Sequence, residues 1–351
     1  MKEMTRIERF DATLAREELD RVCVMAFSTS LMIAKYSDLK VSDIRWDPKL
    51  ATVAGHAWMK YGADDFYYNS ELMAPLKDCG IPLIERDNHH SSPTDFFFNT
   101  PEDIEAKEFP MDPMDPKQTY WMNLGLFDKT RLAREKWGDD YIIQPGFWGI
   151  ITQAGLLRGV EALMIDMMLE EDLVHKLVKK TEDLIQGIQS RLCEAGAHSI
   201  MNADPTGSED LMDVETYRKF LSNSNKRIVS DVKTNYDVKY VLHICGDTAK
   251  TCQVAPEIGV DIYSFDYQVP CSHYKRAIGD KCVILGNVPT NTVTMIKNVE
   301  EVIAAARLCI KQGAEGGGYI LGGACDVPIE SPFENVRSIL EAAEKYSAID
   351  D

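Results

Sequence analysis

The stretch KCVILGNVPTNTVTMIKNVEEVIAAARLCIKQGAEGGGYILG, residues 281–322, contains the pattern that decides the fold. Its first run, Lys281–Gly286, and its last, Gly318–Gly322, are nearly all apolar, which is typical of strands buried on both faces of a parallel sheet. Between them, Asn298 and Glu301 form a helix-start signal, because each side chain can bond the backbone N–H of the other residue. A helix is expected through VIAAARLCI, so the stretch predicts a strand–helix–strand unit.

The same alternation extends through the second half of the chain. Three further apolar runs are candidate strands, namely His198–Ala203, Lys239–Ile244 and Asp261–Phe265. Helical stripes or start signals lie beside them at Leu173, Leu177, Leu184, Ile188 and Leu192 with Gly196 as a stop, at Asp213, and at Ser331, Pro332 and Glu334. Strand–helix alternation of this kind predicts a parallel α/β protein.

The first half of the chain is less regular. Plausible strands are Val22–Ala26, either Asp65–Tyr68 or Ile81–Glu85, and Tyr141–Gln144, which bring the total to about eight. No glycine-rich dinucleotide fingerprint or P-loop follows an early strand, which argues against a nucleotide-binding Rossmann fold. We therefore expect residues 1–351 to form one α/β domain, a (β/α)8 TIM barrel with long insertions in its N-terminal half.

Composition limits the classes of partner. The formal net charge is −18 and no basic stretch interrupts it, so nucleic acid and anionic membranes are not expected as partners. The N-terminus has no apolar signal-peptide core, and no run of about 18 apolar residues occurs, so a cytoplasmic location is expected. The nine cysteines are scattered and odd in number, which favours reduced thiols over a disulfide framework.

A candidate metal site follows two of the buried strands. His243 and Cys245 end one strand, and residues i and i+2 of an extended chain point to the same side. Cys325 follows another strand, and the C-terminal ends of barrel strands meet on one face. A hydrogen-bonded core histidine and two small apolar cysteines would give the same letters. Both fragments, however, end strands, continue into a Gly/Asp turn and precede helices, so we predict that the three residues bind Zn²⁺ with an open position.

Other strand ends supply weaker candidates. Asp204 is a candidate catalytic residue that can orient a ligand or handle a proton, although a plain turn residue fits its position equally well. Asp266 and Asn287 also follow strands and are candidate cofactor-binding residues that line the pocket. The insertion around residues 87–135 adds the pair His89–His90, for which loop surface is the simpler interpretation, and the aromatic run Phe96–Phe98, which can close over a substrate or form a satellite core.

Five fragments, in this order along the chain, resemble the methylcobamide:coenzyme M methyltransferase branch of the uroporphyrinogen decarboxylase superfamily. They are GLLRGVEALMIDMM (155–168), ADPTGSEDLMDVETYRKFL (203–221), VLHICGD (241–247), ILGNVP (284–289) and GGACDVPIESPFENVRSIL (322–340). Residues 1–140 match only in general layout. The decarboxylase branch carries an arginine-rich N-terminal motif for porphyrinogen carboxylates, and the corresponding stretch DRVCVMAFSTSLMIAKYSD lacks it.

The resemblance implies a function as well as a fold. His243, Cys245 and Cys325 take the places of the family's zinc ligands. A methyl group would move between a corrinoid, carried by a corrinoid-binding partner protein, and a small thiol such as coenzyme M, which zinc deprotonates. Three alternatives stay open: demethylation of a methoxylated or methylamine donor in the opposite direction, a decarboxylase of the uroporphyrinogen type, and a non-catalytic binder of zinc or corrinoid.

Overall fold

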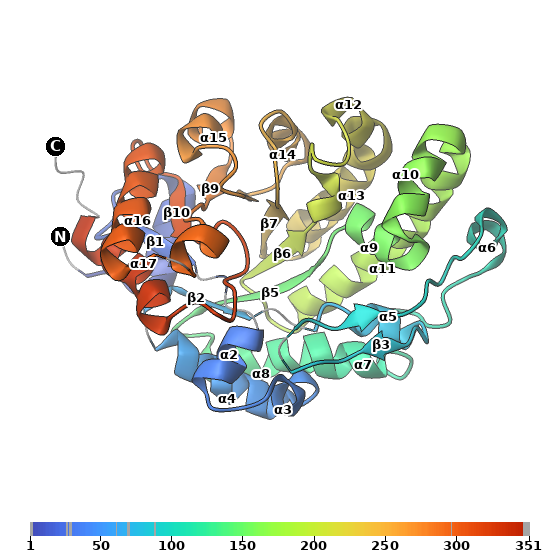
Figure 1. Cartoon of the computed structure of the whole chain (residues 1–351), viewed down its shortest axis with the longest axis horizontal. Helices are drawn as coiled ribbons and strands as arrows, with labels where there is room; N and C mark the ends of the chain where they lie inside the picture. Colours follow the sequence, from blue (N-terminus) through green and yellow to red (C-terminus); the bar gives the residue numbers. More distant parts are fainter. Residues whose placement is uncertain are drawn as a thin grey trace.

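The computed structural model describes residues 3–25, 27, 30–60, 62–68, 71–87, 89–295 and 297–346. Within them, eight parallel strands form one sheet in the order β1-β10-β9-β8-β7-β6-β5-β2 (Figure 1). The strands are β1 (Cys23–Met25), β2 (Asp65–Tyr68), β5 (Ile142–Trp148), β6 (Ser199–Ala203), β7 (Lys239–Ile244), β8 (Ile262–Phe265), β9 (Val283–Leu285) and β10 (Tyr319–Gly322). This arrangement confirms the predicted (β/α)8 barrel.

The two ends of the sheet, β1 and β2, meet through one aspartate rather than through a full ladder. The Asp64 backbone N–H donates to the Val24 carbonyl at 2.8 Å, and the Asp64 carboxylate accepts from the Val24 N–H at 2.8 Å. Asp64 also forms an ion pair with Arg9, at 2.7 Å. The barrel is therefore nearly closed, and a fully buried carboxylate holds its seam.

Helices cover the outside of the barrel. In the first half they are α1 (Arg6–Ala15), α2 (Ser30–Tyr36), α3 (Val41–Arg45), α4 (Pro48–Met59), α5 (Ala74–Asp78), α6 (Pro101–Ala106), α7 (Tyr120–Met122) and α8 (Asp128–Trp137). In the second half they are α9 (Ile150–Arg158), α10 (Val160–Leu169), α11 (Glu171–Glu194), α12 (Val214–Tyr217), α13 (Asn223–Asn235), α14 (Val254–Ile258), α15 (Cys271–Ile278), α16 (Val299–Gly313) and α17 (Phe333–Tyr346). None of the described helices is both long and apolar enough to cross a bilayer.

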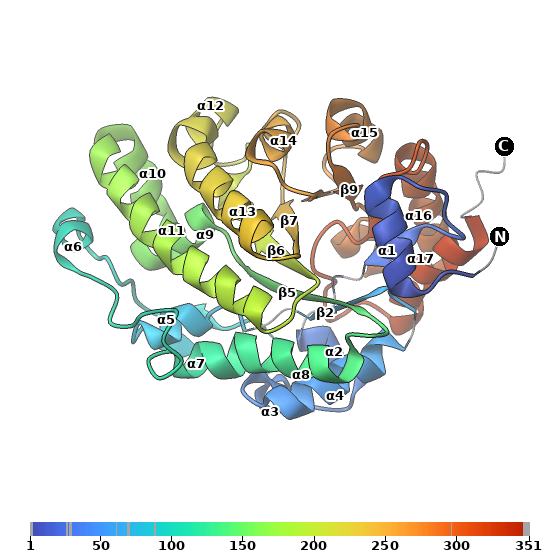
Figure 2. The same cartoon turned by 180° about the vertical axis from the view of Figure 1, so that it is seen from behind.

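The barrel interior is filled by side chains. Met25, Met201, Val241 and Leu285 belong to this inner cluster, and Phe10 of α1 joins it. Figure 2, which shows the molecule from behind, brings α1 to the front. Because the described interior is packed, a substrate is expected beyond the C-terminal ends of the strands, the face that carries the chemistry in barrels of this type.

The sequence-based expectations for the strands hold with small changes. Of the two early alternatives, Asp65–Tyr68 is the barrel strand β2. Ile81–Glu85 contains only β3 (Leu83–Ile84), which pairs antiparallel with β4 (Ser92–Pro93) outside the barrel. In the predicted strand Val22–Ala26, Ala26 lies outside the described residues. The insertion between β2 and β5 also contains α5, α6 and α7, so the predicted irregular segment is partly helical.

Candidate metal centre

The strand β7 delivers two of the predicted metal ligands to one point. His243 is its second-last residue and Cys245 directly follows it. The Nε2 atom of His243 lies 3.0 Å from the Sγ atom of Cys245. His243 is only 3% exposed, whereas Cys245 is partly accessible from the mouth of the barrel.

The third predicted ligand arrives from β10. The Sγ atom of Cys325 lies 3.2 Å from that of Cys245, although the two residues are 80 positions apart in the chain. One donor atom from each of His243, Cys245 and Cys325 lies within 4.8 Å of the others. No other cluster of three or more histidine, cysteine or acidic side chains with metal-binding spacing occurs among the described residues.

The donor set suits zinc. Zinc–nitrogen and zinc–sulfur bonds of about 2.0 and 2.3 Å at a tetrahedral ion place neighbouring donors about 3.5–3.8 Å apart. The observed separations of 3.0 and 3.2 Å are therefore within about half an ångström of that geometry. Without a cation, the arrangement disfavours a thiolate at Cys325. The pKa of Cys325 is raised well above its usual range, mainly by its hydrogen bond with Cys245 and secondly by burial. A divalent ion would remove this conflict and leave one position for a reactant.

The strand β8 contacts the candidate ligands at the end of β7 through Ser264, a residue that the sequence did not predict as part of the site. Ser264 is fully buried, and its Oγ atom lies 2.9 Å from Nδ1 of His243. The Oδ2 atom of Asp266 accepts a 2.9 Å hydrogen bond from the N–H of Gly246, the residue after Cys245. Ser264 sits inside an apolar run, IYSF, so the sequence contained no signal beyond one hydroxyl in a buried strand.

Asn287, the other candidate cofactor-binding residue, faces the same strand end. Its Nδ2 atom donates to the carbonyls of Asp266 and Val269, each at 3.0 Å. Asp266 and Asn287 are 9% and 5% exposed. In this structure both side chains hold backbone near the metal ligands, and their predicted contact with a cofactor stays a prediction.

Asp204 lies at the end of β6 but outside the group of three donor atoms. Its Oδ1 atom accepts from the Thr152 N–H at 2.8 Å, at the N-terminus of α9. It is fully buried, and burial raises its pKa to about 6. Its Oδ2 atom has no hydrogen-bond partner among the described residues. The predicted catalytic role of Asp204 stays a prediction, and the contact with α9 is the role visible here.

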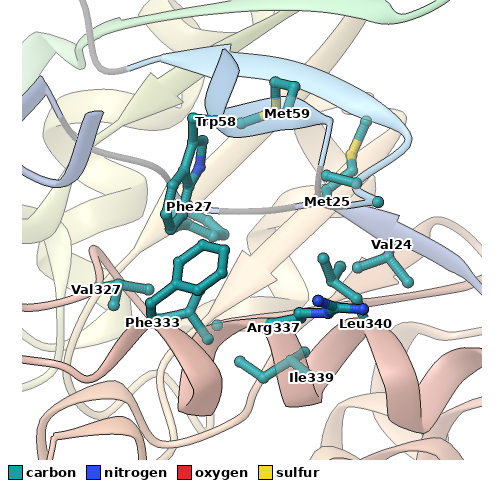
Figure 3. Close-up of a pocket in the computed structure, with 14 residues that line it drawn as sticks. Val24, Met25, Phe27, Trp58, Met59, Val327, Phe333, Arg337, Ile339 and Leu340 are labelled. Atoms are coloured by element: carbon teal, nitrogen blue, oxygen red, sulfur yellow. The ribbon is translucent and has the colours of Figure 1, made fainter. Parts of the chain in front are cut away.

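An apolar wall closes the other side of the histidine. The ring of Phe27 lies 5.1 Å from that of His243 between centroids. Behind it, Phe27, Trp58 and Phe333 surround a cavity of about 30 Å³ (Figure 3). No motif in the sequence marks Phe27 as a neighbour of His243. This wall keeps water away from the buried imidazole, which strengthens any electrostatic interaction made there.

The insertion does reach the metal centre, although its aromatics mostly do not. His90 Nε2 lies 3.7 Å from Oδ2 of Asp326, the residue after Cys325. Phe98 is fully buried and packs against Phe97, with ring centroids 4.8 Å apart, and both pack into the main hydrophobic cluster of the protein and not into a separate satellite core, whereas Phe96 is 44% exposed.

Comparisons with known proteins agree with this fold. A family model described as uroporphyrinogen decarboxylase (URO-D) matches residues 5–346. The methylated-thiol–coenzyme M methyltransferase of Methanosarcina mazei is 28% identical over 65% of this chain and 60% of its own length. The methylcobamide:CoM methyltransferase MtbA of Methanosarcina acetivorans is 24% identical over 99% of both chains. The chain thus spans about three fifths of the first relative and nearly all of the second.

A solved structure is similar along its whole length. It is described as a methyltransferase from Methanosarcina mazei and superimposes with a TM-score of 0.85 at 22% identity. The match covers 99% of this chain and 100% of that chain. At this level of identity the likeness establishes the shared fold.

Proposed function

The chain belongs to the uroporphyrinogen decarboxylase family, and we propose that within it this protein is a zinc-dependent methyltransferase linked to a corrinoid. One observation carries the proposal: a nitrogen and two sulfur donors, from His243, Cys245 and Cys325, converge within 4.8 Å at the catalytic end of the barrel. Three protein ligands leave the fourth position of a tetrahedral ion for a reactant, which is the pattern of catalytic zinc sites.

The chemistry assigned to each group follows from its surroundings. Zinc bound here would lower the pKa of a thiol in the open position and so make it a nucleophile at neutral pH. His243, Cys245 and Cys325 would hold the ion, and Cys245 and Cys325 are accessible enough from the mouth to leave that position open. Phe27 excludes water from the side of His243. The protein's task is then to hold the thiol beside a methyl group delivered from outside the barrel.

The acceptor we propose is a small thiol such as coenzyme M, and the methyl donor is a corrinoid carried by a corrinoid-binding partner protein. The names of two relatives support this choice, since both include coenzyme M. Demethylation of a methylated small molecule, with transfer of the methyl group to the corrinoid, would use the same zinc position. The close pair of cysteines argues against a metal-free decarboxylase of the uroporphyrinogen type, because that reaction requires no metal ligands.

The decisive experiment combines metal analysis with an activity assay. Purified wild type is expected to contain one zinc per chain and to demethylate methylcobalamin with at least one of several small thiols. Cys325→Ala should lose most of its zinc and activity, because one of three protein ligands is missing. Cys193→Ala, a change of the same type at a buried cysteine of α11, is the matched control. Wild type without zinc, or Cys325→Ala with full zinc and activity, would refute the proposal.

A further inference from the structure

The strand β8 lies beside β7 in a register that pairs it with the metal ligands. In the parallel ladder, His243 is the partner of Ser264 and Ile244 is the partner of Phe265. The next step along both chains brings Cys245 level with Asp266. Positions i and i+2 of an extended chain share a face, so Ser264 of β8 and Asp266, which directly follows β8, are expected on the same face as His243 of β7 and Cys245, which directly follows β7.

We propose that β8 is a positioning strand for the metal centre, in which Ser264 makes His243 an Nε2 donor and Asp266 fixes the turn that carries Cys245. The inference rests on the proposed zinc site and adds to it two residues that do not touch the metal. Ser264 and Asp266 are thus positioning residues, not ligands.

The first half of the inference concerns the imidazole. A histidine that binds a metal through Nε2 must carry its proton on Nδ1, and that N–H needs an acceptor. Ser264 Oγ lies 2.9 Å from Nδ1 and is fully buried, so water does not replace it. Nε2 then faces Cys245 at 3.0 Å, as the donor set requires. The hydroxyl thereby occupies Nδ1 and fixes the ring orientation; with a metal on Nε2, it accepts from the proton that remains on Nδ1.

The second half concerns the turn after Cys245. Gly246 has a φ of +80°, and Asp266 Oδ2 accepts from its N–H at 2.9 Å. From the other side, Asp210 Oδ2 accepts from the N–H of Asp247 at 3.2 Å. The two carboxylates hold consecutive peptide N–H groups, which fixes the direction in which the Cys245 side chain leaves the backbone.

Asn287 extends this support to the next strand. Its amide donates to the backbone carbonyl of Asp266, so the residue whose carboxylate accepts from Gly246 is itself held through its backbone by a residue that follows β9. The strands β7, β8 and β9 are neighbours in the sheet. Each strand end therefore contacts the one before it, and the turn after Cys245 is held both from the end of β8 and, through Asp210, from the exposed loop that follows β6.

The test measures zinc affinity by competition with a chelator, together with the absorption spectrum of the cobalt(II)-substituted protein. Ser264→Ala is expected to bind zinc about 10- to 100-fold more weakly and to change the cobalt spectrum. Ser338→Ala, which removes an equally buried hydroxyl in α17, is the matched control and should change neither. Equal affinity and spectra for the two variants would overturn the role of Ser264.

A second pair tests the turn. Asp266→Ala should weaken zinc binding about tenfold, whereas Asp266→Asn should largely restore it, because an amide oxygen can still accept from Gly246. Identical effects of the two substitutions would contradict the positioning role of Asp266.

A measurement on wild type avoids any question of folding. The ¹⁵N resonances of His243 in the zinc-loaded protein should show a proton on Nδ1 and metal on Nε2, and the reverse assignment would overturn the inference. Wild type that binds no zinc would instead refute the proposed function itself, so the two failures are distinguishable.

Discussion

Cys245 and Cys325 place their sulfurs 3.2 Å apart across the mouth of the barrel, although they follow strands β7 and β10, which are separated in the sheet by β8 and β9. Two thiols so close, with a histidine nitrogen 3.0 Å from one of them, are the geometry on which the proposed zinc site rests.

Metal removal should make this pair the most readily oxidised thiols in the protein. The other seven cysteines are buried, whereas Cys245 and Cys325 are partly accessible. After treatment with a chelator, the mild oxidant diamide should convert these two thiols to a disulfide and leave the rest reduced, as peptide mass spectrometry can show. The zinc-loaded protein should resist the same treatment. Equal oxidation with and without zinc would mean that the sulfurs do not bind the metal.

The glycine after Cys245 should not tolerate a side chain. A Cβ on Gly246, at φ +80°, would lie 2.1 Å from Asp210 Oδ2, which already accepts from Asp247. Gly316→Ala is the matched control, because its φ is +72° with nothing within 4 Å of an added Cβ. We expect Gly316→Ala to cost about 1 kcal/mol of unfolding free energy from the left-handed backbone alone. Gly246→Ala should cost more and also weaken zinc binding. Equal losses of unfolding free energy in the two variants, with unchanged zinc affinity in Gly246→Ala, would contradict the predicted clash with Asp210.

Asp204→Asn separates the two roles open to that residue. The amide oxygen can keep the bond from Thr152 N–H, so the fold and the zinc content should remain. If Asp204 takes part in catalysis, as we predict, methyl transfer should fall by about 100-fold or more, since one positioned acid or base typically contributes about 10²- to 10⁴-fold. Full activity of the variant would show that Asp204 has only a structural role, which is to hold the N-terminus of α9. Zinc analysis and the methylcobalamin assay, run on the same preparation, give both readouts.

Stability should fall in mild acid because of His198. Burial, followed by the nearby Arg134, lowers the pKa of this histidine to about 4, and its Nδ1 atom accepts from the Ile143 N–H at 2.9 Å. In the unfolded chain the pKa of His198 is near 6.5, so between about pH 6.5 and 4 the unfolded state binds a proton at this histidine and the folded state does not. The unfolding free energy should thus decrease as pH falls from about 6.5 to 4, by about 1–2 kcal/mol after allowance for partial exposure.

His198→Asn provides the comparison, because its side-chain oxygen can still accept from Ile143 while it has no titrating group. Denaturant unfolding between pH 7 and 4 should show a smaller slope for the variant than for wild type. Parallel curves would show that other groups cause the acid sensitivity.

The sequence by itself predicted most of the strands and the three candidate ligands. Apolar runs such as Lys239–Ile244 can be buried on both faces only in a parallel sheet, and helix-start signals such as Asn298 with Glu301 divide them into units. His243, Cys245 and Cys325 could be proposed as ligands because strand ends in such a sheet share one face. These properties are local, or depend only on the period of a strand.

Only the tertiary structure decided which strand closes the barrel and what surrounds the ligands. Asp65–Tyr68 and Ile81–Glu85 are both short runs of strand type, and the choice between them depends on Asp64 reaching Val24 across the seam. The hydroxyl of Ser264 contacts His243, 21 positions away, and the strand register that pairs the two residues cannot be read from the sequence. The sequence predicts Asp266 as a residue that lines the pocket, and only the structure shows that its carboxylate accepts from the Gly246 N–H. Such contacts arise between segments distant in the chain, so their distances exist only once the sheet has formed.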